Sequence, residues 1–286
     1  MDTAVDQNPD TAPETGQLAS DATVGVFDSG IGGFTVARAI LSRRPSLNLV
    51  YYGDNINMPY GGRPPEQIAR FARHSIEFLM EQGIDMLAVG CNASNSVLGQ
   101  GDLKSFGIPV YDLVGSTIDH YRVAGGLPDK LAIVATEATI NSGYWHRKLK
   151  EAFPQLELTD IAAPEFVPLV EAARPDLPAM RDAISLHLGR LPEQGVTTVI
   201  HGCTHFPLLQ KVMEEVVPGL TYIDPAHCLA DKMLNQLPEP AADTPGELHI
   251  FSSLPGPTFY RTGASALGRG IRDLTTMYIV SPREED

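Results

Sequence analysis

The chain has little cysteine, a shortage of positive charge and no long hydrophobic run. Its 286 residues include three cysteines, Cys91, Cys203 and Cys228, which is too few for the disulfide framework of a small secreted domain. No apolar stretch approaches the roughly 20 residues that a membrane-spanning helix needs. The first residues also lack the basic segment and apolar core of a signal peptide. We therefore expect a cytoplasmic protein with reduced thiols and no membrane partner.

The charge is strongly acidic, with 21 lysines and arginines against 35 acidic residues and a formal net charge of −14. Residues 1–22 contain acidic side chains and no basic ones, so we expect a disordered acidic tail there. The remaining acidic excess argues against a nucleic-acid partner, which requires a basic face. An anionic substrate would have to be held by local donors such as backbone N–H groups and the side chains of serine, threonine and asparagine.

Short apolar runs alternate with segments of helical periodicity from residue 23 onward. Strands are predicted at 24–27, 48–52, 86–89, 109–114, 131–135, 156–160, 196–200, 220–223, 248–252 and 277–280. Helices are predicted at 34–41, 66–82, 116–123, 140–153, 166–173, 179–188 and 206–217. This alternation predicts an α/β fold with mainly parallel sheets flanked by helices. Because the strands are too many for one comfortable sheet, we predict two similar α/β domains, residues 23–115 with 227–286 and residues 116–226, with the active site between them.

Two of the predicted strands end in the same small motif. Residues 85–96 (DMLAVGCNASNS) and 197–209 (TTVIHGCTHFPLL) each place Gly-Cys after an apolar run and before small polar residues. Ligands bind at the carboxyl ends of strands in open α/β sheets, and N–H groups at the start of a following helix lower a thiol pKa. We interpret Cys91 and Cys203 as a catalytic thiol pair facing one pocket, although a cysteine after a strand is also commonly an inert core residue. Cys228 is expected to be structural.

Other motifs near the strand ends allow alternative readings. His201, Cys203 and His205 alternate like metal ligands, but a structural zinc site uses four ligands in paired spacings and no C-x-x-C occurs; we expect no metal. Residues 28–33 (DSGIGG) lack the third glycine of a dinucleotide fingerprint and the lysine of a P-loop. This segment is either a tight strand-to-helix turn capped by Asp28 or Ser29, or a part of the site in which Asp28 meets a substrate ammonium group.

Several blocks of sequence resemble the glutamate racemases of the cofactor-independent aspartate/glutamate racemase superfamily. They are GVFDSGIGGFTV at 25–36, YYGD and MPYGG within 51–62, GCN at 90–92, ATEATINSGYW at 135–145, FVPLVE at 166–171, GCTHFPLL at 202–209 and IDPA at 223–226. The blocks follow the family order across the whole predicted folded region. The resemblance implies two pseudo-symmetric domains with the active site at their interface. It also implies interconversion of L- and D-glutamate without a cofactor. This reaction would supply D-glutamate for peptidoglycan, and so serve cell-wall biogenesis and cell shape. A homodimer is left open.

The resemblance also implies roles for individual residues. Cys91 would deprotonate D-glutamate and Cys203 would deprotonate L-glutamate, one as thiolate while the other is thiol. Asp28 and His205 would assist the proton transfers, with Glu171 as a further assisting acid. The residues expected to hold the substrate are Ser29, Tyr60, Gly61, Asn92, Ala93, Thr136 and Thr204.

The sequence departs from the family pattern beside the first thiol. Where relatives usually read Cys-Asn-Thr, this chain has Ala93, which removes a hydroxyl expected to donate to a substrate carboxylate. A hydrogen bond to a charged group is worth about 1.5–3 kcal/mol, so glutamate binding would weaken by one to two orders of magnitude unless Ser94 or water substitutes. A racemase of another acidic amino acid such as aspartate, and a racemase-fold protein with a binding or regulatory role, therefore stay open as alternatives.

Overall fold

The computed structural model describes residues 18–20, 22–98, 103–172, 177–240, 244–254, 256–267 and 275–279. Most of the predicted acidic tail, residues 1–17 and 21, lies outside these described residues. Within them, no helix combines the length and apolar character needed to cross a membrane.

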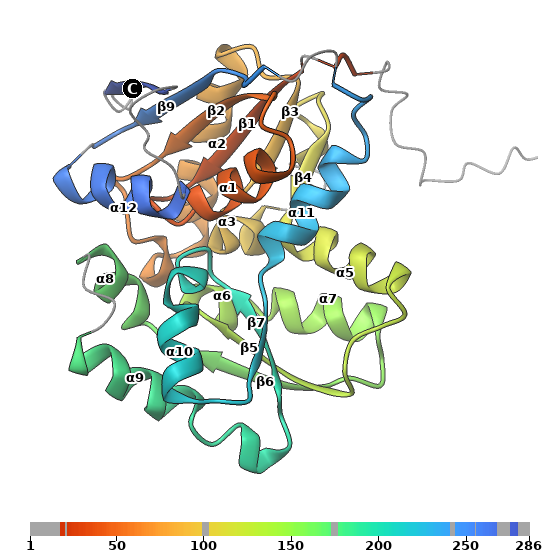
Figure 1. Ribbon diagram of the computed structural model, residues 1–286, viewed down its shortest axis with the longest axis vertical. Coiled ribbons are helices and arrows are strands. Elements are labelled where there is room, and N and C mark those ends of the chain that lie inside the picture. The colour runs from red at the N-terminus through yellow and green to blue at the C-terminus, as the bar shows by residue number, and fades with distance from the viewer. Residues whose placement is uncertain are drawn as a thin grey trace, which may run out of the picture.

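The strands form two parallel sheets, which lie in the upper and lower halves of the molecule (Figure 1). The first sheet has six strands in the order β10 (Thr275–Ile279), β9 (Leu248–Ser252), β2 (Asn48–Gly53), β1 (Thr23–Asp28), β3 (Met86–Val89) and β4 (Val110–Asp112). The second has four, in the order β6 (Glu157–Ala162), β5 (Lys130–Ala135), β7 (Thr198–Gly202) and β8 (Thr221–Ile223). Every pair of neighbouring strands among the described residues is parallel. The predicted α/β fold with parallel sheets is confirmed.

Helices follow most strands and cover the sheets. In the first half of the chain they are α1 (Phe34–Arg43), η1 (Tyr60–Gly62), α2 (Pro65–Glu81), α3 (Asn92–Val97), α5 (Leu113–Val123), α6 (Glu137–Ser142) and α7 (Tyr144–Ala152). Farther along are α8 (Phe166–Glu171), α9 (Pro178–Leu188), η2 (Pro192–Gln194), η3 (Phe206–Leu209), α10 (Gln210–Val216), α11 (Pro225–Leu234) and α12 (Pro257–Leu267).

Buried apolar periodicity explains why these segments fold as they do. In α2, Ile68, Ala72, Ile76 and Leu79 recur at helical spacing and are fully buried, so one face of the helix packs on the first sheet while the other meets solvent. Strand β3 is buried along its whole length, as expected for an inner parallel strand covered on both faces. The largest hydrophobic cluster contains residues of both sheets. This shared core fixes the position of the carboxyl ends of one sheet's strands relative to those of the other.

Two segments predicted as continuous helices are each divided into two in the structure. The helix predicted at 140–153 breaks at Gly143, whose left-handed backbone (φ 61°) ends α6 and lets α7 begin at Tyr144. The helix predicted at 206–217 begins as the 3₁₀ segment η3, with Pro207 in its first turn, and becomes α-helical only at Gln210. Helical periodicity in the sequence continues through both breaks, which is why it did not reveal them.

Two further differences concern helix starts. The strand predicted at 109–114 ends at Asp112, because the Asp112 carboxylate accepts a hydrogen bond from the Gly115 N–H (2.7 Å) and caps α5. Helices α11 and α12 were not predicted. For α11 the signal was present, since Asp224 caps the helix and Pro225 occupies its first turn.

The late strand β9 pairs with β2 and so returns the chain to the first sheet. The two points at which the predicted division crosses between domains, 115/116 and 226/227, lie inside α5 and α11, which pack against one another. The division into residues 23–115 with 227–286 and residues 116–226 stays a proposal.

Candidate active site

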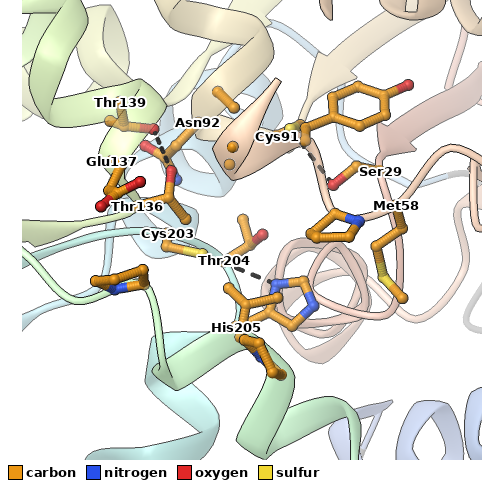
Figure 2. A pocket seen from close by; sticks show the side chains of 18 residues that line it. Ser29, Met58, Cys91, Asn92, Thr136, Glu137, Thr139, Cys203, Thr204 and His205 are labelled. Carbon is orange, nitrogen blue, oxygen red and sulfur yellow. Dashed lines mark hydrogen bonds between the residues drawn. The ribbon is translucent and has the colours of Figure 1, made fainter. Parts of the chain in front are cut away.

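A cavity of about 200 Å³ lies at the carboxyl ends of β1, β3, β5 and β7, and so between the two sheets (Figure 2). Of the residues predicted to form a site, ten line it: Ser29, Tyr60, Gly61, Cys91, Asn92, Ala93, Thr136, Cys203, Thr204 and His205. The cavity is smaller than the 300–1,000 Å³ usual for drug-sized ligands, which suits a small metabolite.

The two cysteines stand on different walls of this cavity, each at the end of a strand from a different sheet (Figure 2). Cys91 follows β3 and precedes α3, and its Sγ lies 3.7 Å from the Ser29 hydroxyl, to which it donates. Burial and the negative charge of Asp28 raise the pKa of the Cys91 thiol to about 12, against smaller lowering effects from Ser94 and Ser29. Cys91 is therefore a thiol at neutral pH.

The wall around Cys203 has a different electrostatic character. Its Sγ lies 3.8 Å from Nδ1 of His205, and Nε2 of the same ring lies 2.8 Å from Oε1 of Glu171. Burial lowers the pKa of His205, but hydrogen bonds and charge from Cys203 and Glu171 outweigh burial and hold it well above its usual value. The protonated ring carries a hydrogen on Nδ1 and directs it towards the Cys203 sulfur.

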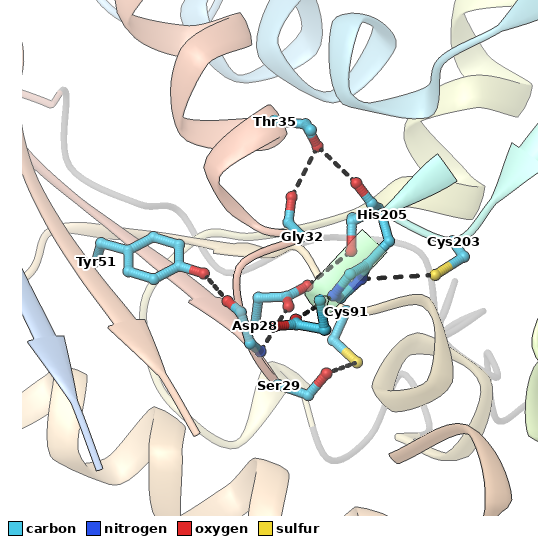
Figure 3. Close-up of polar contacts among 11 residues, drawn as sticks. Asp28, Ser29, Gly32, Thr35, Tyr51, Cys91, Cys203 and His205 are labelled. Atoms are coloured by element: carbon cyan, nitrogen blue, oxygen red, sulfur yellow. Dashed lines mark hydrogen bonds and ion pairs between the residues drawn. The ribbon is translucent and has the colours of Figure 1, made fainter. Parts of the chain in front are cut away.

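Asp28 connects the two walls without lining the cavity (Figure 3). Its fully buried carboxylate accepts hydrogen bonds from the Gly30 N–H (2.9 Å) and the Thr204 hydroxyl (2.9 Å). Burial raises the pKa of Asp28, although the nearby charge of His205 and these hydrogen bonds lower it. Asp28, the last residue of β1 in the first sheet, thus binds Thr204, which follows β7 of the second sheet. Glu171 does not line the cavity either, and contacts His205, which does.

The glycine-rich turn after β1 permits this close approach. A Cβ atom on Gly32 would lie 2.4 Å from Oγ1 of Thr204 and 2.5 Å from Nδ1 of His205, closer than real Cβ contacts occur. The Thr35 hydroxyl bonds both Gly32 O (2.9 Å) and Thr204 O (3.2 Å) (Figure 3). Glycine at 32 is therefore required by packing between the two halves of the site.

The Tyr60 ring lines the cavity, but its hydroxyl is directed away to a buried polar cluster. It donates to Oδ2 of Asp54 (2.6 Å), whose two carboxylate oxygens also accept from Asn57 and, at Oδ1, from Ser253. The loop that frames one side of the cavity is thereby tied to the segment following β9.

The departure at Ala93 lies in the cavity wall, beside Asn92. Ser94 is fully buried next to the Cys91 thiol and is not among the lining residues, so it does not take the place of the missing hydroxyl. Among the hydroxyl-bearing residues that line the cavity, Thr136 and Thr139 form a pair with their Oγ1 atoms 3.1 Å apart.

Sequence reasoning missed part of the lining. The missed residues are Met58, Pro59, Gly62, Glu137, Thr139, Pro164, Val167 and Pro168. All but Pro164 belong to blocks that carried the resemblance (MPYGG, ATEATINSGYW and FVPLVE), so the blocks were the available signal.

The metal interpretation of His201, Cys203 and His205 finds no support. The His201 ring stacks on Tyr222 at 5.1 Å with an interplanar angle of 5°, whereas Cys203 and His205 face the cavity. Throughout the part of the chain that the structure describes, no group of three or more His, Cys, Asp or Glu side chains is placed to hold a metal ion.

Comparison with known proteins gives a consistent result. The Asp/Glu/hydantoin racemase family matches residues 35–233. A glutamate racemase from Picosynechococcus sp. is 34% identical over 71% of this chain and 72% of its own. The structure of glutamate racemase from Thermus thermophilus in complex with β-chloro-D-alanine has a TM-score of 0.77 and 30% identity, covering 92% of this chain and 98% of that one.

A further likeness extends to the fold alone. The structure of glutamate racemase from Francisella tularensis in complex with D-glutamate has a TM-score of 0.81 at 22% identity, covering 92% of this chain and 98% of that one. The family match spans well over half of this chain, and the Picosynechococcus racemase aligns with 71% of it. The chain belongs to the Asp/Glu/hydantoin racemase family of isomerases.

Proposed function

We propose that this protein interconverts L- and D-glutamate by proton abstraction and donation between Cys91 and Cys203. The observation that carries the proposal is the placement of the two thiols on different walls of one small cavity, at strand ends of the two sheets. Inverting a stereocentre requires a base on one face of the α-carbon and an acid on the other. The similarity to glutamate racemases supports glutamate as the substrate.

The two thiols have different surroundings, and this difference suggests which of them acts first on L-glutamate. Cys203 lies beside a protonated His205, whereas Cys91 is a buried thiol. The Cys203 thiolate takes the α-proton of L-glutamate, forming an S–H bond and leaving the electron pair on the α-carbon. The Cys91 thiol then gives its proton to the opposite face, which yields D-glutamate and a thiolate at Cys91. The reverse reaction exchanges the roles.

The remaining polar groups hold charges in place during these transfers. Glu171 keeps His205 protonated, and Asp28 fixes Thr204 in the cavity wall. The hydroxyls and amide of Ser29, Thr136, Thr204 and Asn92 are neutral donors suited to the substrate carboxylates. We further propose that the reaction takes place in the cytoplasm, where three free thiols stay reduced, and supplies D-glutamate for peptidoglycan.

The proposal is tested by incubating chelator-treated protein with L-glutamate or L-aspartate in heavy water. Optical rotation and incorporation of deuterium at the α-carbon are followed together. With L-glutamate, we expect the optical rotation to fall to zero while deuterium is incorporated at the α-carbon. Faster conversion of L-aspartate would reassign the substrate, and no exchange with either amino acid would refute racemase activity and leave a binding or regulatory role.

A further inference from the structure

One hydrogen bond joins the cavity wall to a residue that does not line it. The indole Nε1 of Trp145, on α7, donates to Oδ1 of Asn92, on α3, at 3.0 Å. Both side chains are buried, Trp145 with 2% exposure and Asn92 with 4%. The bond therefore connects α7, which lies after β5 of the second sheet, to the residue that follows Cys91 at the end of β3 in the first sheet.

The chemistry of the donor determines how the Asn92 amide is oriented. An indole nitrogen is a donor only, so the amide atom facing Trp145 must be the oxygen, and Nδ2 must point the other way. Nδ2 is buried and has no hydrogen-bond partner among the residues that the structure describes. Buried amide donors are nearly always bonded, so this N–H group marks a place for an acceptor supplied by a ligand.

The surroundings of Asn92 indicate what that acceptor is. Asn92 lines the cavity together with Thr136 and Thr139, and the three side chains gather at the same end (Figure 2). One of the two hydroxyls donates to the other (3.1 Å), which leaves the second hydroxyl and the amide N–H free to donate to a ligand. Two converging donors suit a carboxylate. This is also the wall in which Ala93 provides no hydroxyl.

We propose that Trp145 is a positioning residue, which holds Asn92 with Nδ2 ready to donate to a carboxylate of the substrate. The proposal rests on the proposed function, since it concerns the binding of that substrate. Without the indole N–H, the amide is free to turn over and present its oxygen to the carboxylate, and the two would repel.

The break between α6 and α7 is part of this arrangement. The left-handed Gly143 ends α6 and changes the chain direction, so that Trp145 lies in the first turn of α7. Leu149, one turn farther on the same face, is fully buried but has no part in the Asn92 contact. It offers a matched control for loss of packing.

The test is a double-mutant cycle measured by steady-state kinetics in both directions. Trp145→Phe keeps an aromatic ring and removes the donor. We expect it to raise KM for both glutamate enantiomers about 10-fold, equivalent to about 1.4 kcal/mol, with kcat little changed. In an Asn92→Ala background the same substitution should add nothing further, because Trp145 acts through Asn92. Leu149→Ala should lower the unfolding temperature and leave KM unchanged.

A second measurement uses the protein's single tryptophan. Titration of the wild type with DL-glutamate should give a saturable change in Trp145 fluorescence, because the carboxylate polarises the amide that the indole contacts. An unchanged KM in an active Trp145→Phe enzyme, or independent KM effects of the Trp145 and Asn92 substitutions, would overturn the proposal, as would an unresponsive emission. Failure of the wild type to racemise glutamate would instead refute the proposed function, and the titration would still judge the role of Trp145.

Discussion

The contact between Glu171 and His205 makes a sharp prediction about the pH dependence of catalysis. Glu171→Gln keeps the size of the side chain and removes its charge, at a carboxylate oxygen 2.8 Å from Nε2 of His205. The two side chains are only 16% and 4% exposed, so solvent screens little of their interaction. The substitution therefore tests whether protonated His205 supports Cys203.

The size of the effect follows from the strength of the bond. A hydrogen bond to a charged group contributes about 1.5–3 kcal/mol, and one pKa unit corresponds to about 1.36 kcal/mol. We expect the pKa of His205 to fall by about one to two units in Glu171→Gln. The alkaline limb of kcat/KM should move to lower pH by the same amount. Because L- and D-glutamate have equal free energies in solution, kcat/KM must decrease by the same factor in both directions.

The same substitution changes stability in a defined pH range. The folded pKa of His205 is raised, so its stabilising contribution is complete below its unfolded value near 6.5 and is lost as pH rises through the folded pKa. Glu171→Gln should therefore lower the free energy of unfolding most at pH values below about 6.5.

The assay combines a pH profile of kcat/KM with an NMR titration of the His205 ring. Glu165→Gln is the matched control, since Glu165 contacts His187 at 3.0 Å outside the cavity and should leave the profile unchanged. A lowered His205 pKa with an unmoved alkaline limb would refute the reasoning, because Cys203 would then not depend on the imidazolium.

Three further predictions concern single positions. Cys91→Ser and Cys203→Ser should each lower kcat for racemisation at least about 1,000-fold, because a serine hydroxyl is a far weaker acid and base; full turnover of either variant would make that cysteine a packing residue. Ala93→Thr should lower KM for glutamate about 10-fold or more by restoring a donor to the cavity wall, and an unchanged KM would show that Thr136 and Thr139 already supply it. His201 is buried, and burial, opposed by Gln210, lowers its pKa to about 3. The unfolded chain therefore binds a proton below about pH 6.5 that the folded protein does not, and the wild type should lose about 2 kcal/mol of unfolding free energy between pH 7.5 and pH 5 on this account. His201→Leu should abolish that loss in urea denaturation, and equal acid sensitivity of both proteins would contradict it.

The sequence by itself determined the local parts of this protein. Apolar runs such as Met86–Val89 specify buried strands because their side chains can be covered on both faces, and the motif Gly-Cys after two of them marks strand ends. Parallel strands place those ends at one edge of a sheet. This was enough to predict an α/β fold and to single out Cys91 and Cys203.

The relation between the two halves was decided only by the tertiary structure. The hydrogen bond from Thr204 to Asp28 joins residues 176 positions apart, and the one from Trp145 to Asn92 joins residues 53 positions apart. No local pattern encodes such pairs, because they exist only when the sheets pack at a particular distance, as the close contact of Gly32 with Thr204 shows. The surroundings of the thiols follow from the same packing: burial and the charge of Asp28 raise the pKa of Cys91, whereas the Cys203 sulfur contacts the His205 ring.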